Sequence, residues 1–272
     1  MTDTHHIFER IALALERLSP PVETTLLGTA PAYRWNGKAL QNVPNFSPLD
    51  IALLCGIDAQ KAALLENGRR LASGYGAHDI LLWGARGAGK SALVKSTVAA
   101  LVKENLTLRL VEASGEDLAS LPSLFALLAK DDRPTIVFFD DLGFESNGDA
   151  TRHLRSVLDG GVAARPSHVR LYVTSNRRHI LPRNSEEQAS AINPRDVVDD
   201  QLALADRFGL SLGFHVCDQN QYLAMVAGYA AHIGIPFDPA DALLWAAQRG
   251  ARSGRIAWHY AIEIAGRAGK AL

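Results

Sequence analysis

One short segment of the chain has the residue types of a phosphate-binding loop. Residues 84–91 read Gly-Ala-Arg-Gly-Ala-Gly-Lys-Ser and match the pattern GxxxxGK[ST]. In this pattern, backbone N–H groups surround phosphate oxygens, the lysine reaches the β- and γ-phosphates, and the hydroxyl binds Mg²⁺. The segment follows an apolar run and precedes a helical pattern, so the positive end of a helix dipole would face the phosphates. The residues expected to bind nucleotide are Gly84, Ala85, Arg86, Gly87, Ala88, Gly89, Lys90, Ser91 and Ala92.

Two carboxylates follow a later apolar segment. Residues 135–139 are typical of a buried strand and lead directly into Asp140 and Asp141. Asp140 could hold the Mg²⁺ shell together with Ser91, while Asp141 could orient or deprotonate an attacking water. Paired acids at a strand end can also cap a helix, but the phosphate loop upstream favours the catalytic interpretation.

Three further polar residues come later in the chain. The apolar segment 171–173 ends in Thr174-Ser175-Asn176, where a polar side chain could reach the attacking water or the γ-phosphate. Arg207 precedes another apolar segment, and Arg255 lies at the start of a helical pattern. Each arginine alone is more typical of a surface charge, so the order of the motifs carries the functional interpretation.

An alternation of short apolar segments with helical patterns predicts the frame that would position these residues. Such alternation is typical of an α/β fold with a parallel sheet. We expect strands at 79–83, 107–112, 135–139, 169–174 and 212–216. We expect helices near 90–104, 116–130, 149–159 and 196–205.

The two ends of the chain have different patterns. At the C-terminus, helical spacing predicts three helices at 219–233, 239–249 and 254–267. At the N-terminus we expect an amphipathic helix at 5–18, a hairpin at Asn36-Gly37, and helix starts near Ser47 and Asp58. Residues 183–195 are polar and typical of a surface loop. The predicted divisions are an extension at 1–50, a nucleotide-binding domain at 51–217 and a helical lid at 218–272.

The composition is that of a globular protein. The chain has 272 residues, of which 47% are hydrophobic, and its formal net charge is -1. This balance does not by itself require nucleic acid or an anionic membrane as a partner. The two cysteines, Cys55 and Cys217, lie far apart, and no segment has the length of a signal peptide core or a membrane span. We therefore expect a cytoplasmic protein that has no membrane partner.

The order of the motifs resembles that of AAA+ ATPases over about residues 50–268. More closely, several segments look like a bacterial family catalogued as DUF815. These segments are residues 56–68, 81–95, 138–145, 164–182, 204–210 and 250–261. The resemblance implies a P-loop NTPase fold with a five-stranded parallel sheet flanked by helices and a small three-helix lid. It also implies ATP and Mg²⁺ as ligands.

The resemblance assigns roles to individual residues. Lys90 and Ser91 would form the Walker A pair, and Asp140 and Asp141 the Walker B pair. Asn176 would be sensor 1.

The resemblance also places three residues outside these motifs. Arg207 would be an arginine finger that reaches the γ-phosphate of a neighbouring subunit. Arg255 would be sensor 2, and Ile57 would contact adenine.

Two features differ from the pattern of many AAA+ proteins. Walker B often ends in Asp-Glu, whereas Asp141 is one methylene shorter and less able to reach water. We therefore expect slow or partner-stimulated hydrolysis, with Glu145 as a possible substitute base. Residues 111–124 contain no aromatic residue that could form the pore loop of a protein-unfolding ring. This absence disfavours threading of polypeptide.

Three functions are consistent with the motifs. The favoured one is an ATPase that forms a homo-oligomer, such as an ATP-dependent hexameric ring, and switches or remodels a protein partner. The second is a helicase loader or initiator that acts on DNA, motivated by Asp-Asp and by an arginine-rich stretch. Its arginines are Arg165, Arg170, Arg177, Arg178 and Arg183. The third is a monomeric P-loop kinase or nucleotide switch.

Overall fold

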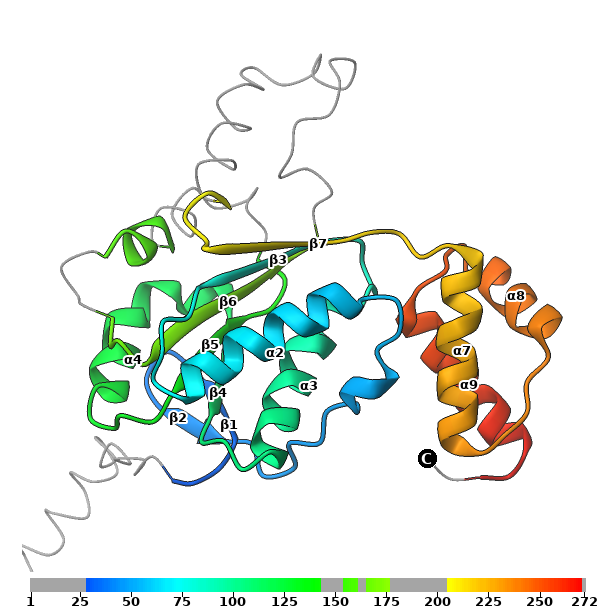
Figure 1. Cartoon of the computed structure of the whole chain (residues 1–272), viewed down its shortest axis with the longest axis horizontal. Helices are drawn as coiled ribbons and strands as arrows, with labels where there is room; N and C mark the ends of the chain where they lie inside the picture. The colour runs from blue at the N-terminus through cyan, green and yellow to red at the C-terminus, as the bar shows by residue number, and fades with distance from the viewer. Residues whose placement is uncertain (1–27, 143–153, 161–164, 177–204, 271–272) are drawn as a thin grey trace, which may run out of the picture.

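The computed structural model describes residues 28–142, 154–160, 165–176 and 205–270. Figure 1 shows a twisted sheet with helices on both faces, and a separate group of three helices beyond the carboxyl ends of the strands. The predicted helix at 5–18 and the predicted loop at 183–195 lie outside the described residues. Within the described part of the chain, no helix is both long enough and apolar enough to span a membrane.

Seven strands form the sheet, in the order β2-β1-β4-β5-β6-β3-β7. The strands are β1 (Ala32–Trp35), β2 (Leu40–Asn42), β3 (Ile80–Gly84), β4 (Arg109–Ala113), β5 (Thr135–Phe139), β6 (Val169–Ser175) and β7 (Leu210–Phe214). Every neighbouring pair is parallel except β1 and β2. Strands β3 to β7 are the five predicted strands, each within two residues of its expected ends.

The sheet is larger than the predicted five strands because the N-terminal hairpin joins it. The side chain of Asn36 accepts hydrogen bonds from the backbone of Lys38 and Ala39 and stabilises the hairpin turn. Strand β1 then pairs with β4, with Tyr33 opposite Val111. The predicted division at residue 50 stays a prediction, although the hairpin and the domain share one sheet.

Helices cover both faces of the sheet. On one face, α2 (Asp58–Ala72) and α3 (Lys90–Lys103) pack on side chains such as Ile80 and Leu82. On the other face, α4 (Leu121–Leu128) packs on the alternate residues, such as Leu81. The strands are therefore apolar on both sides, as expected for a parallel sheet between helical layers.

Two predicted helices have different bounds. The pattern at 116–130 forms a 3₁₀ helix, η2 (Gly115–Ser120), followed by α4, because Ser114 and Asp117 cap η2 and a proline opens α4. The helix expected near Ser47 is only the short η1 (Ile51–Leu53), and Asp50 is its cap. Of the helix expected at 149–159, residues 154–158 are helical and the preceding residues lie outside the description, as does nearly all of 196–205.

The three predicted C-terminal helices are present and form the lid. They are α7 (Gln219–Ile233), α8 (Pro239–Gln248) and α9 (Gly254–Arg267). Each helix is capped by a side chain that accepts a hydrogen bond from a backbone N–H of the first turn, and the capping residues are Asp218, Asp238 and Ser253 respectively. Buried tyrosines and alanines fill the space between the helices. The lid therefore has a small core of its own.

Candidate functional site

The loop between β3 and α3 is shaped by its glycines. Gly84 has φ +124°, and a Cβ atom there would collide with the backbone of Phe214 on the neighbouring strand. The N–H of Ala85 donates to the carbonyl of Phe214 at 2.9 Å, which fixes the start of the loop. Gly87 also has a positive φ, of +72°. The predicted phosphate loop therefore adopts a backbone that other residues would strain.

Lys90 is the first residue of α3 and is only 5% exposed. Its Nζ donates to the carbonyl oxygens of Gly84 and Ala85, at 2.9 Å and 2.8 Å. It also donates to Oδ1 of Asn176 at 2.9 Å. The lysine therefore links the loop to the end of β6.

The environment of Lys90 disfavours its positive charge. Burial lowers the pKa of the ammonium to about 8, and the carboxylates of Asp141 and Asp140 oppose this effect. The positive charges of Arg255 and Arg86 lower the pKa further. An anion bound beside Lys90 would counter the effect of these cations, so the electrostatics of the loop favour a phosphate ligand.

Asp140 follows β5 and lies beside the loop. Its Oδ1 accepts a hydrogen bond from the hydroxyl of Ser91 at 2.5 Å. The same oxygen accepts a second hydrogen bond from the hydroxyl of Thr174 at 2.7 Å. The structure thus brings the two predicted metal ligands, Ser91 and Asp140, into direct contact. Carboxylate and hydroxyl oxygens of this kind are suitable ligands for Mg²⁺.

Asp141 has an unusual backbone conformation for a residue other than glycine, with φ +54°. Such a left-handed conformation costs about 1 kcal/mol or more. Its Oδ1 accepts a hydrogen bond from Nδ2 of Asn176 at 2.5 Å, and its Oδ2 lies 4.0 Å from the guanidinium of Arg86. Asn176 therefore contacts both Lys90 and Asp141.

These groups lie at one end of a cavity of about 1000 Å³. Arg86, Asp140, Asp141 and Asn176 line this polar end, together with the loop from Gly87 to Ala92. Residues Gly84 and Ala85 do not line the cavity, although their carbonyl oxygens hold Lys90.

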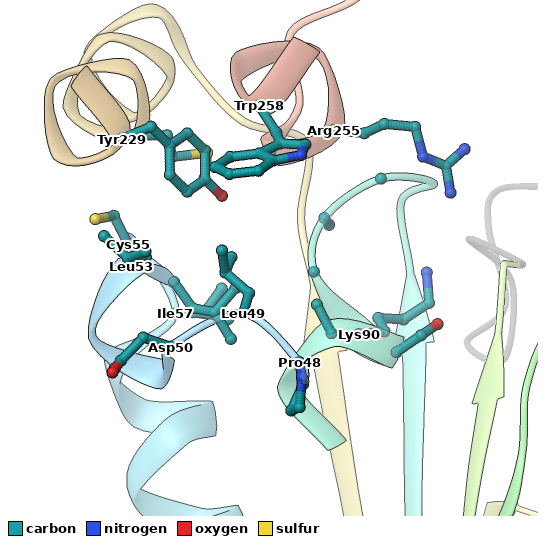
Figure 2. Close-up of a pocket in the computed structure, with 18 of the residues that line it drawn as sticks. Pro48, Leu49, Asp50, Leu53, Cys55, Ile57, Lys90, Tyr229, Arg255 and Trp258 are labelled. Carbon is teal, nitrogen blue, oxygen red and sulfur yellow. The ribbon is translucent and has the colours of Figure 1, made fainter. Parts of the chain in front are cut away.

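The other end of the cavity is apolar and lies between the sheet domain and the lid. It is lined by Leu49, Leu53, Leu54, Ile57, Met225, Tyr229 and Trp258. Figure 2 shows Tyr229 and Trp258 on the lid, facing Leu49 and Ile57 across the cavity. The rings of Tyr229 and Trp258 meet edge to face, with centroids 5.2 Å apart. Ile57 was expected to contact adenine. The lid aromatics were not predicted, because their position along the chain has no fixed spacing from the loop.

The phosphate loop also contacts the lid directly. A Cβ atom on Gly87 would lie 2.9 Å from Oγ of Ser253, the residue that caps α9. Arg255, two residues later, lines the cavity and extends toward the same end as Lys90 (Figure 2). The start of α9 is therefore placed against the loop, and the role of Arg255 as sensor 2 stays a prediction.

Arg207 does not line this cavity. Its Nε forms an ion pair with Asp159 at 2.5 Å, and its side chain is 31% exposed. Its role as an arginine finger stays a prediction. Glu145, the possible substitute base, lies outside the described residues.

Two members of the arginine-rich stretch have partners within the chain. Arg165 forms an ion pair with Asp79 at 2.7 Å. Arg170 donates hydrogen bonds to the carbonyl oxygens of Ala77, Ser167 and Val169. These two side chains therefore have structural roles, while Arg177, Arg178 and Arg183 lie outside the described residues.

Several solved structures share this fold. RuvB of Thermotoga maritima, a Holliday junction branch migration motor, has a TM-score of 0.52 and 17% identity, over 83% of this chain and 68% of that chain. Orc1 of Aeropyrum pernix in complex with DNA has a TM-score of 0.54 and 16% identity, over 83% and 63%. Domain III of the Thermotoga maritima replication initiation protein DnaA has a TM-score of 0.51 and 14% identity, over 85% and 92%. At these identities, the likeness shows the fold.

The sequence itself also matches a known family. The match covers residues 28–268, and the family is described as "Protein of unknown function (DUF815)". Comparison with curated proteins finds no match. The similar structures are AAA+ P-loop ATPases. With the loop, the paired aspartates and the lid in place, the chain belongs to the DUF815 family and has the fold of AAA+ P-loop ATPases.

Proposed function

We propose that this protein binds ATP with Mg²⁺ in the cavity and hydrolyses ATP to ADP and phosphate. One observation carries the proposal. Lys90, Asp141 and Asn176 form a continuous hydrogen-bonded group at the polar end of a cavity whose other end is apolar. A triphosphate needs cations and backbone donors, whereas a purine base is favoured by apolar and aromatic contacts.

The residues at the polar end fit both ligands. Gly87 has no side chain that could lie between the loop and the phosphates, and Lys90 is a buried cation. Ser91 and Asp140 would hold Mg²⁺, which supplies positive charge that offsets the charge of the phosphates. At the apolar end, Trp258 and Ile57 would contact the base.

Each residue of the polar group has a separate task in the proposed reaction. Lys90 exchanges its bonds with carbonyl oxygens for bonds with phosphate oxygens. Asp141 orients the attacking water and accepts its proton. Asn176 holds the carboxylate of Asp141 through Nδ2 and fixes its position relative to Lys90.

We further propose that Arg207 completes the site of a neighbouring copy in a homo-oligomer that acts on a macromolecular partner. Arg207 lies outside the cavity of its own chain, and its side chain is partly exposed. Both observations fit a group that acts on another subunit. Such an arginine contributes about 10³-fold or more to turnover in related chemistry.

Mixing two inactive variants tests this proposal. Arg207→Ala keeps its own cavity but lacks the arginine, while Asp141→Asn keeps the arginine but lacks the carboxylate. If Arg207 acts between copies, each variant alone is inactive and still binds ATP, and the mixture recovers part of the phosphate release. Arg69→Ala, which removes a surface arginine paired with Glu104, is the control and keeps full turnover. A mixture as inactive as its components would contradict action between copies.

DNA is a second candidate partner, since two similar structures are a branch migration motor and a complex with DNA. The local bonds of Arg165 and Arg170 give this candidate less support. Binding to single- and double-stranded DNA, measured at several salt concentrations, distinguishes DNA from a protein as the partner, because phosphate contacts produce a steep salt dependence. Absence of binding at low salt would exclude this candidate.

A further inference from the structure

Thr174 contacts both aspartates at the polar end of the cavity. It is the penultimate residue of β6 and is only 1% exposed. Its hydroxyl donates to Oδ1 of Asp140 at 2.7 Å and accepts a hydrogen bond from the backbone N–H of Asp141 at 2.8 Å. A hydroxyl has one hydrogen to donate. The Thr174 hydroxyl therefore uses its donor on one aspartate and its acceptor capacity on the other.

The backbone of Thr174 holds the same turn from a second position. Its carbonyl oxygen accepts a hydrogen bond from the N–H of Leu142 at 2.9 Å. Three consecutive residues after β5 are thus bound to one residue of the neighbouring strand. Two of these three bonds involve the side chain, so a side-chain substitution can remove them while the backbone bond remains.

The contact with Asp140 determines which of its oxygens remains available. Oδ1 of Asp140 accepts hydrogen bonds from the hydroxyls of Thr174 and Ser91. For Oδ2, the described part of the chain provides no hydrogen-bond donor. One oxygen is therefore fixed by the protein, and the other is left for a cation.

The contact with Asp141 supports its left-handed backbone. The N–H of Asp141 donates to the hydroxyl of Thr174 while φ of Asp141 is +54°. In this conformation the short side chain reaches Asn176 and lines the cavity. The hydrogen bond to Thr174 thus holds the backbone that brings the short carboxylate of Asp141 into the cavity. It explains how an aspartate can act at a position where many AAA+ proteins have the longer glutamate.

We propose that Thr174 is a positioning residue that sets both aspartates, Asp140 for cation binding and Asp141 for water activation. This inference rests on the proposed ATPase function. Thr174 itself contacts neither ATP nor water in the proposed reaction. Residues that orient metal ligands in this way typically contribute 10- to 100-fold to metal affinity or activity.

Substitution by valine and by serine tests the role of the hydroxyl. Thr174→Val keeps the shape and removes both hydrogen bonds, whereas Thr174→Ser keeps the hydroxyl. We expect Thr174→Val to lower kcat about 10- to 100-fold with little change in KM for ATP. We also expect about 10-fold weaker Mn²⁺ binding in the presence of ADP, measured by electron paramagnetic resonance. Thr174→Ser should keep kcat and Mn²⁺ affinity close to the wild-type values.

Thr97→Val is the matched control. Thr97 is fully buried on α3, and its hydroxyl has no hydrogen-bond partner among the described residues. The same substitution at Thr97 therefore removes a buried hydroxyl without touching the aspartates, and should leave kcat and Mn²⁺ affinity unchanged. Thermal unfolding of all variants verifies the fold. If Thr174→Val does not fold, Thr174→Ala removes the hydroxyl without adding volume and gives the same test.

The outcomes separate this inference from the proposed function. Unchanged kcat and unchanged Mn²⁺ affinity in a folded Thr174→Val or Thr174→Ala protein would overturn the role of Thr174. Failure of Thr174→Ser to restore either value would overturn it too, because the hydroxyl would then not be the active group. Absence of ATP binding and turnover in the wild-type protein would instead contradict the ATPase function itself.

Discussion

The two ends of the cavity are built in different ways. The polar end consists of one continuous segment, residues 86–92, and of residues that follow the neighbouring parallel strands β5 and β6. The apolar end consists of side chains from η1 and its flanking residues, from α7 and from α9, which are distant in sequence. Hydrogen bonds determine the first end, and packing between the sheet domain and the lid determines the second.

This difference has a functional consequence. At the polar end, a displaced atom loses a directional hydrogen bond, so we expect substitutions there to affect the rate of the reaction. At the apolar end, contacts are numerous and individually weak, so we expect substitutions there to affect affinity. Substitutions at each end of the cavity therefore test this division.

Lys90→Met removes the central cation of the polar end. We expect turnover to fall about 10²- to 10³-fold, because the lysine would stabilise charge that develops on the phosphates. Thermal stability should not fall, since a buried ammonium is replaced by an apolar side chain of similar length. Phosphate release and thermal unfolding measure the two effects. Lys95→Met, on the same helix but outside the cavity and paired with Glu112, should keep its turnover.

Gly87→Ala tests the contact between the loop and the lid. The new Cβ atom would lie 2.9 Å from Oγ of Ser253, at a residue whose φ is +72°. Helix α9 carries Trp258 of the apolar end, so a displaced α9 should lower affinity rather than the rate. We expect nucleotide affinity to fall about 10-fold, as a loss of about 1.4 kcal/mol would produce. Titration with a fluorescent ATP analogue measures this.

Gly74→Ala separates strain from the lid contact. Gly74 has a similar φ of +75°, but nothing lies within 4 Å of its Cβ position. Alanine at either position adopts a strained backbone, so both variants should lose stability. Gly74→Ala should nevertheless keep full nucleotide affinity. Equal loss of affinity in both variants would show that the lid contact has no special importance.

Trp258→Ala tests the apolar end. We expect KM for ATP to rise about 2- to 10-fold with kcat unchanged, because one aromatic contact is worth about 0.5–1.5 kcal/mol. Trp258→Phe keeps an aromatic ring and should restore most of the affinity. Steady-state kinetics measure both constants. A fall in kcat with unchanged KM would contradict the division between the two ends.

The pH dependence of stability tests the electrostatics of Lys90. Its pKa in the folded protein is about 8, below the usual value of 10.5. Between these values the unfolded chain binds more protons, so the contribution of Lys90 to stability rises as pH increases and is constant below pH 8. From pH 7.5 to pH 9.5, the free energy of unfolding of the wild type should rise by on the order of 1 kcal/mol relative to that of Lys90→Met. Urea unfolding at the two pH values measures this difference. A constant difference would contradict the lowered pKa.

Much of the fold and of the polar end was predictable because the signals are local. The pattern GxxxxGK[ST] lies within eight residues, and the three lid helices have continuous helical spacing. Asp140, Asp141 and Asn176 each follow an apolar strand, and parallel strands bring their carboxyl ends to one edge. Their mutual proximity therefore follows from the fold class.

Other features could not be predicted because they depend on which distant residues meet. The hairpin was expected, but its pairing with β4 is decided by the open edge of the sheet and the burial of Tyr33 and Trp35. Trp258 and Tyr229 contribute to the cavity only because the lid packs beside η1. Their spacing along the chain has no relation to the loop.

Local sequence patterns are sufficient to identify the phosphate loop, the paired aspartates and the order of strands and helices along the chain. They do not predict that Thr174 bonds both aspartates, that Arg207 pairs with Asp159, or that aromatic residues of the lid complete the cavity. Motifs depend on short stretches of backbone. Hydrogen bonds between side chains and the shape of a cavity depend on how separate elements pack.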